Sequence, residues 1–309
     1  MNSKRIRKSI IYFVGWLGLC ACSLIVRLIP ERFMYVFARR LAFLGYLLAA
    51  KQRKIALASL NLAFGRDKTP EEIKEIAREC FVSMAKSGVE LVFFMDKTEV
   101  VRKRFHIVGK ENLESALAKG KGVILVSAHF GNFPLMLGRL SLEGYKTGGI
   151  MRPMKDRRTE KLFLKERARF GVKTIYSIPR RECVVATIRS LRDNELIFIP
   201  LDQNFGTAGV FVDFFGVKAA TATGPVVLAR RTQAEIVPCF VVRQKDDTHK
   251  IIIEPALKLE EGLDEEASIL LSVQRITSVI ESYIRKYPAE WGWIHRRWKS
   301  RPNLKEGGV

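Results

Sequence analysis

Apolar and polar positions divide the chain into a helical N-terminal part and a longer part in which short apolar runs alternate with amphipathic stretches. From residue 31 to about 95 the apolar residues recur with helical spacing, in "ERFMYVFARRLAFLGYLLA" and "TPEEIKEIARECFVSMAKSGVELVFF". Thr69 suits a helix N-cap and Pro70 suits a first turn, so the second of these helices is predicted to begin there.

After about residue 105 the pattern predicts strands alternating with helices. The strand candidates are "GVILVSA" (122–128), "KTGGIM" (146–151), "VKTIY" (172–176), "ELIFIPL" (195–201), "EIVPCFVV" (235–242) and "KIIIEP" (250–255). Helices are predicted over 156–170, 181–193 and 266–287, the last ending before Pro288. This alternation indicates an α/β fold with a largely parallel central sheet flanked by helices. The polar "RQKDDTH" joins the last two strands, which we expect to form a hairpin at one edge of the sheet.

The N-terminus has the pattern of a membrane anchor. The basic "MNSKRIRKS" precedes an uncharged apolar stretch of 17 residues, 10–26, at the lower limit of the ~17–25 residues that cross a bilayer. A cleaved signal peptide is the rival interpretation, but the chain continues in an arginine-rich amphipathic pattern without a clear small-residue cleavage site. We therefore expect an uncleaved anchor over 1–30 with the rest of the chain on the cytosolic side. Residues 31–309 are predicted to form the α/β domain, with a helical lead-in over about 31–104.

Charge restricts the class of partner. Lys and Arg number 53 against 32 acidic residues, a formal net charge of +21, which favours nucleic acid, an anionic membrane face, or an acidic or phosphorylated partner. The anchor favours the membrane and gives no reason to expect nucleic acid. The five cysteines show no spacing typical of a metal site or a disulfide framework, which fits a reducing compartment.

Two predicted strands end in polar residues that can carry chemistry. His129 follows the apolar run "GVILVSA", and Asp202 follows "ELIFIPL". Ligands and chemistry collect at the carboxyl ends of strands in open α/β sheets. If the two strands are neighbours, the imidazole and carboxylate could form a pair that activates a hydroxyl or water. A structural capping histidine and an aspartate in a turn are the alternatives.

Other segments point to a binding surface. The phenylalanines of "GVFVDFFG", among them Phe214 and Phe215, could be core residues or could line a slot for a long alkyl chain. Arg152 follows another strand end and could bind a phosphate or carboxylate, or simply belong to a solvated basic turn. The C-terminal "PAEWGWIHRRWK" interleaves aromatic and cationic residues, a pattern of nucleic-acid stacking, of a membrane interface or of docking to an acidic protein.

These motifs together resemble the bacterial lipid A biosynthesis acyltransferases, a group within the lysophospholipid acyltransferase superfamily. The resemblance covers nearly the whole chain, through the N-terminal anchor, "RKIALASLNLAF" from Arg53, "HFGNF", "MRP", "RARFG", "LDQNFG", "VFVDFFG" and "WGWIHRRWK". It implies metal-free transfer of a fatty acyl chain from an acyl thioester to a glycolipid hydroxyl at the inner face of the bacterial cytoplasmic membrane. The thioester would be carried by acyl carrier protein or coenzyme A, and the acceptor would be phosphorylated, as a lipid A precursor is.

The resemblance also assigns roles to residues. It makes His129 the general base, Asn132 a group for the oxyanion or for positioning, and Arg53, Arg152, Phe214 and Phe215 substrate-binding candidates. The family motif has Glu or Asp after the histidine and four further residues, a position that Pro134 occupies here.

The missing carboxylate leaves two expectations open. Asp202 is the first candidate to replace it, because it also ends a buried strand, and Asp213 is the second. The alternative to an active enzyme is a catalytically silent relative that binds lipid or carrier protein at the membrane surface.

Overall fold

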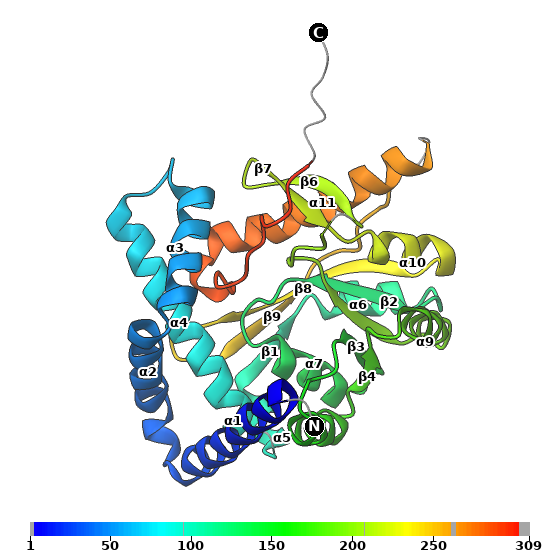
Figure 1. The fold of residues 1–309 in the computed structure, drawn as a ribbon. Helices are drawn as coiled ribbons and strands as arrows, with labels where there is room; N and C mark the ends of the chain where they lie inside the picture. The colour runs from blue at the N-terminus through cyan, green and yellow to red at the C-terminus, as the bar shows by residue number, and fades with distance from the viewer. Residues whose placement is uncertain (1–2, 95, 207, 261–263, 303–309) are drawn as a thin grey trace.

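The computed structural model describes residues 3–94, 96–206, 208–260 and 264–302 (Figure 1). Its N-terminal helices are α1 (Ser3–Leu28), α2 (Glu31–Leu48), α3 (Ala50–Phe64), α4 (Pro70–Phe93) and α5 (Thr98–Arg104). The later helices are α6 (Lys110–Leu117), α7 (Phe133–Leu142), α8 (Arg157–Arg169), α9 (Arg180–Arg192), α10 (Gly224–Thr232), α11 (Glu265–Lys286) and the short 3₁₀ helix η1 (Pro288–Glu290). The strands are β1 (Phe105–Val108), β2 (Val123–Ser127), β3 (Thr147–Met151), β4 (Lys173–Tyr176), β5 (Leu196–Pro200), β6 (Val210–Phe214), β7 (Val217–Thr221), β8 (Glu235–Arg243) and β9 (His249–Ile253).

The central sheet has seven strands in the order β1-β9-β8-β2-β5-β3-β4. The strands β8, β2, β5, β3 and β4 run parallel to one another, so the predicted α/β fold with a largely parallel sheet is confirmed. The predicted hairpin between β8 and β9 is also confirmed, but its place at the sheet edge is wrong. The short strand β1 pairs with β9 on the outside and forms that edge instead.

Helices cover both faces of the sheet. Ile124 and Val126 of β2 belong to one core cluster, whereas Val123 and Leu125 belong to the other, because successive residues of a strand point to opposite faces. The first cluster includes side chains of α9, α10 and α11, and the second includes side chains of α6 and α7. Burial on both faces explains why these strands are continuous apolar runs in the sequence.

The N-terminal helices form a separate group beside the sheet. Figure 1 shows α1, α2 and α3 on the left of the view, whereas β3, β4 and α9 lie on the right. Thr69 caps α4 as predicted, since its side chain accepts a hydrogen bond from the Glu72 backbone while the Glu72 carboxylate bonds the Thr69 backbone. The helix α4 supplies buried residues to both core clusters and therefore joins this group to the sheet.

One stretch within the described residues, Ser9–Leu28, is a helix long and apolar enough to cross a membrane, and only 6% of its most apolar window is buried. The helices α2 and α3 meet the same criterion only as a pair bent by 90°. Length and composition alone support these assignments. They agree with the predicted anchor.

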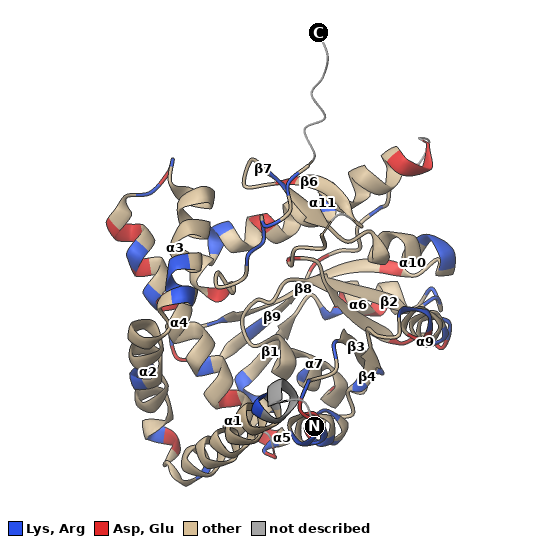
Figure 2. Ribbon diagram, in the orientation of Figure 1, with Lys and Arg blue, Asp and Glu red and all other residues tan. Residues whose placement is uncertain are grey.

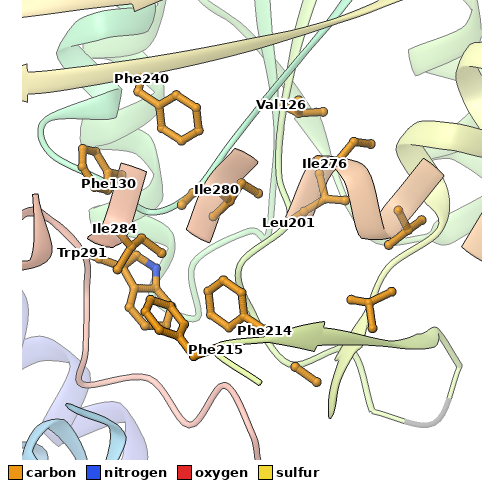
Figure 3. Packing of buried hydrophobic residues seen from close by; sticks show 14 of the residues in the cluster. Val126, Phe130, Leu201, Phe214, Phe215, Phe240, Ile276, Ile280, Ile284 and Trp291 are labelled. Carbon is orange, nitrogen blue, oxygen red and sulfur yellow. The ribbon is translucent and has the colours of Figure 1, made fainter. Parts of the chain in front are cut away.

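The three tryptophans and Arg297 of the C-terminal segment after α11 are buried, contrary to the expectation of an aromatic surface, whereas Arg296 and Lys299 are exposed. Trp291, Trp293 and Arg297 are each at most 1% exposed. Phe214 and Phe215 belong to the same packing (Figure 3), with the Phe214 ring centroid 5.6 Å from that of Trp291. Phe214 is 1% exposed and Phe215 is 6% exposed, so these two side chains offer no open slot to an alkyl chain.

The core position of Phe214 gives a stability prediction. Replacing it with alanine removes a buried ring and leaves a cavity, so Phe214→Ala should lower the free energy of unfolding by ~3–5 kcal/mol. Phe205, which is 45% exposed, provides the matched control, and Phe205→Ala should stay within about 1 kcal/mol of the wild type. Denaturant unfolding of the purified proteins measures both. Equal, small effects of the two substitutions would contradict the core assignment.

Candidate active site

The structure brings His129 and Asp202 together at the carboxyl edge of the sheet. The strands β2 and β5 are neighbours, with Ser127 paired to Pro200, and each functional residue lies two positions beyond its strand. The Leu201 backbone N–H donates to the Ser127 carbonyl at 3.0 Å and continues this register past the strand ends. His129 Nδ1 then lies 2.9 Å from Asp202 Oδ1, so the pairing that was conditional on adjacent strands is present.

The Asp202 carboxylate is buried and both of its oxygens have partners. Its side chain is 3% exposed, and Oδ2 accepts a hydrogen bond from Trp291 Nε1 at 2.8 Å. Burial alone would raise the pKa of Asp202, but the imidazole and the indole N–H outweigh burial and bring the pKa below its usual value. Asp202 is therefore held as a carboxylate in the interior.

The same contact determines the state of His129. A carboxylate at Nδ1 favours the tautomer that carries its proton on Nδ1 and leaves Nε2 free to accept one. Burial of the ring lowers the pKa of His129, but the Asp202 charge and hydrogen bond more than compensate, so the pKa lies above its ordinary 6.5. The side chain remains 37% exposed, so the imidazole is not enclosed in the core. This is the arrangement of a general base with an orienting carboxylate.

Gln203 occupies the accessible side of the imidazole. Its side-chain Nε2 lies 3.2 Å from His129 Nε2 and 3.4 Å from Nδ1. In the tautomer favoured by Asp202 the amide donates to the free ring nitrogen, where the hydroxyl of a substrate would also donate. Gln203 is exposed, so this contact can be exchanged for a substrate without disturbing the core.

The loop after His129 is held in place by its neighbours. Gly131 has a positive φ of 53°, and a Cβ there would lie 2.2 Å from the Val241 carbonyl oxygen, so glycine is required. Its backbone N–H donates to the Glu290 carbonyl at 2.8 Å. Asn132 then caps α7, and Pro134 falls in the first turn of that helix, as expected for proline.

Asn132 connects this loop to a buried carboxylate on α4. Its side-chain amide donates to Glu90 Oε2 at 2.9 Å and to the Ser87 carbonyl at 3.2 Å. Because these contacts use the amide N–H groups, Asn132 is placed to position the loop and not to face an oxyanion.

Glu90 is the centre of a buried polar cluster that the sequence pattern did not single out. It is 0% exposed and binds the Arg243 guanidinium, His249 Nε2 at 3.1 Å and the Tyr35 hydroxyl at 2.9 Å, in addition to Asn132. Burial opposes ionisation, but the hydrogen bonds from His249 and Arg243 bring the pKa of Glu90 well below its usual value. The sequence feature that could have indicated this cluster is a glutamate within the apolar stretch "SGVELVFF".

The remaining predicted site residues lie apart from the pair. Asp213 is exposed on β6 and forms an ion pair with Lys218 at 3.1 Å, so Asp202 and not Asp213 contacts the imidazole. Arg152 follows β3 at the same sheet edge, with an exposed side chain. Arg53 donates to the Tyr46 and Leu47 carbonyls, which places it at the corner between α2 and α3.

Fold and site together define an α/β protein with an imidazole–carboxylate pair at the carboxyl edge of its sheet, an arrangement that enzymes use for general-base catalysis. Residues 1–300 match the family model described as bacterial lipid A biosynthesis acyltransferase, and the chain belongs to that family, as the motifs predicted. It is therefore an acyltransferase.

Individual relatives agree with this assignment. The chain is 27% identical over 300 residues to the lipid A biosynthesis palmitoleoyltransferase of Escherichia coli (strain K12), covering 94% of this chain and 92% of the relative. It is 28% identical over 297 residues to the lauroyltransferase of the same organism, covering 94% and 93%. A phosphatidylinositol mannoside acyltransferase of Mycobacterium tuberculosis is 24% identical over 209 residues, covering 66% and 63%.

The buried contacts of Glu90 give a prediction about folding stability. Glu90→Ala removes the buried carboxylate that Arg243 and His249 share and leaves Arg243 with only the longer contact of 3.4 Å to Asp247, so it should cost ~3–5 kcal/mol of folding free energy. The matched control is Glu99→Ala, because the Glu99 side chain is 77% exposed and its loss should cost about 1 kcal/mol or less. Denaturant unfolding compares the two variants. The cluster is not a structural centre if Glu90→Ala is as stable as Glu99→Ala.

Proposed function

We propose that this acyltransferase moves a fatty acyl chain from an acyl thioester to a hydroxyl of a phosphorylated glycolipid such as a lipid A precursor. Acyl carrier protein or coenzyme A carries the thioester, and the proposal requires no metal or cofactor. The observation that carries the proposal is the contact of 2.9 Å between His129 Nδ1 and Asp202 Oδ1, which prepares Nε2 to accept a proton.

The relatives and the charge of the chain support this choice of substrates. The two Escherichia coli relatives are named for lipid A biosynthesis, and the mycobacterial relative is named for a different glycolipid, phosphatidylinositol mannoside. Acceptors of both kinds offer a hydroxyl on a lipid-anchored sugar. A formal charge of +21 favours an acidic carrier protein, a phosphorylated lipid and an anionic membrane surface.

In the proposed reaction the acceptor hydroxyl displaces the Gln203 amide and donates to His129 Nε2. His129 removes the hydroxyl proton as the oxygen attacks the thioester carbonyl, and a tetrahedral intermediate forms. Asp202 stays ionised, keeps the imidazole in the required tautomer and stabilises the imidazolium. The C–S bond then breaks, and the departing thiolate takes the proton from His129 Nε2.

Gln203 has a second role in the proposed reaction. Once its amide has left Nε2, its N–H groups remain next to the reacting carbonyl and can donate to the oxyanion. Preorganised donors of this kind stabilise the charge that develops in acyl transfer. Asn132 contributes indirectly, by holding the loop that carries His129.

The proposed location is the cytosolic face of the bacterial inner membrane. Residues 1–30 would be the single anchor and residues 31–309 the catalytic domain, with residues up to about 104 as its helical lead-in. The support is the apolar stretch Ser9–Leu28 and the large apolar side chains that remain exposed on α1 and α2. An exposed apolar surface of this size is typical of membrane contact.

A catalytically silent, lipid-binding relative was the alternative. That role does not require a buried carboxylate that contacts a partly exposed imidazole. Burying such a charge costs free energy that hydrogen-bond donors must offset. The paired arrangement of His129 and Asp202 therefore favours the enzyme.

The proposal is tested by measuring acyl transfer with purified full-length protein in detergent. His129→Ala should reduce kcat/KM by ~10²–10⁴, the usual contribution of a general base. Asp202→Asn should reduce kcat by at least about tenfold and move the acidic limb of the pH profile to lower pH. The shift has this sign because Asp202 raises the pKa of His129, and the base is active only when unprotonated.

Asp213→Asn is the matched control, because it removes a carboxylate that is exposed and paired with Lys218. It should leave both kcat and the pH profile unchanged. Mass spectrometry of the glycolipid product should show one added acyl chain. If Asp202→Asn kept the wild-type kcat while Asp213→Asn lowered it, the orienting role would belong to Asp213. Full activity of His129→Ala would exclude His129 as the base.

A further inference from the structure

A basic groove of about 560 Å³ lies between α3 and the C-terminal segment, outside the His129 site. Lys51 and Lys54 on α3 face Arg296, Lys299 and Arg301 across it, and Trp298 forms part of its apolar lining. Figure 2 shows Lys and Arg residues on α3 and on the C-terminal segment beside it. We refer to this feature as the basic groove.

The cations of the basic groove lack acidic neighbours. No Asp or Glu is among the described residues that line it, and the five lysine and arginine side chains at its rim are exposed. Like charges gathered around one concave surface repel each other, and a bound anion relieves that repulsion. The groove is thus electrostatically suited to an anionic ligand.

Arg297 provides an independent observation. It also lines the groove and is 0% exposed, yet its guanidinium binds only neutral oxygens, those of Gln203, Ala220 and Thr221. Its Nε atom has no hydrogen-bond partner within the described structure. Burial lowers the pKa of Arg297 to about 10, which still leaves it charged at neutral pH. The nearby Asp202 charge acts in the opposite direction, but no carboxylate of the described residues hydrogen-bonds the guanidinium, so its charge also favours an anion in the groove.

The basic groove is connected to the imidazole by one residue. The Gln203 carbonyl accepts from Arg297 Nη1 at 3.2 Å, and the Gln203 side chain contacts His129 Nε2. Gln203 therefore contacts both a residue that lines the groove and the imidazole.

We propose that the basic groove binds a phosphate group of the glycolipid acceptor. This inference rests on the proposed function, because it assigns one part of the same substrate. Guanidinium and ammonium groups are the usual partners of phosphate oxygens in proteins. The apolar lining next to the cations suits the junction of a phosphorylated sugar and its acyl chains.

The surroundings favour a lipid over a docked carrier protein. The end of α2 exposes Leu44, Leu47 and Leu48, the last by 82%, immediately before the α3 lysines. Arg53 fixes this corner by donating to the Tyr46 and Leu47 carbonyls. An apolar edge beside a cationic groove is typical of a surface that meets lipid headgroups.

The test is equilibrium binding of a phosphorylated lipid A precursor in mixed micelles, compared with the same lipid after phosphatase treatment. The full-length protein carries four alanine substitutions at the rim: Lys51→Ala, Lys54→Ala, Arg296→Ala and Lys299→Ala. Its Kd for the phosphorylated lipid should rise about tenfold or more, since each lost ~1.4 kcal/mol is tenfold in affinity. Its Kd for the dephosphorylated lipid and for acyl carrier protein should stay within about twofold of wild type.

The matched control removes four exposed cations elsewhere and changes the net charge equally: Lys121→Ala, Arg180→Ala, Arg181→Ala and Arg192→Ala. It should bind both lipids as the wild type does. Three results would overturn the inference: unchanged binding by the rim variant, equal weakening for both lipids, or weakening confined to acyl carrier protein. Because binding is measured without turnover, groove-dependent binding in a protein that transfers no acyl chain would refute the proposed function and leave the groove assignment standing.

Discussion

The site depends on one buried carboxylate and on the two N–H groups that hold it. Asp202 accepts from His129 Nδ1 through one oxygen and from Trp291 Nε1 through the other. A carboxylate charge is tolerated in an interior only when donors replace the water it has lost. The three residues are far apart in the chain, so the base is oriented only when β2, β5 and the C-terminal segment are all in place.

Two further contacts make that arrangement rigid. Glu90 on α4 fixes Asn132 and thereby the loop that carries His129, while Arg297 donates to the Gln203 carbonyl. These buried groups act on residues adjacent to the pair without touching the imidazole. The N-terminal helices and the C-terminal segment thus help to position the His129–Asp202 pair as well as forming part of the core.

The pair itself could be predicted from the sequence, because two continuous apolar strands ended in His129 and Asp202 and parallel strands deliver such ends to one edge. The sequence could also distinguish Asp202 from Asp213 as the partner of His129. Asp213 lies between Val212 and Phe214, which are both buried, so the alternation of side chains along a strand turns Asp213 outward. Pro134 lies in the first turn of α7, a position that suits proline. This explains how the loop keeps its conformation without the Glu or Asp that the family motif has at this position.

Other features depended on contacts that no local pattern reports. Interleaved tryptophans and arginines look the same on a surface and in a core, and only the partners of Arg297 and Trp291 distinguish them. The strand β1 was not predicted, because its residues Phe105–Val108 are only half buried and directly follow a charged helical turn, so β8 and β9 were placed at an edge that β1 covers. Glu90 was missed because its partners come from four other elements.

The most direct test of the account is a nitrogen NMR titration of the His129 ring in protein labelled at its four histidines, with assignment by His129→Gln. The account predicts that neutral His129 carries its proton on Nδ1, leaves Nε2 unprotonated, and titrates with a pKa above 6.5 that falls in Asp202→Asn. A neutral ring protonated on Nε2, or a pKa unaffected by Asp202→Asn, would contradict the claim that this carboxylate orients the base.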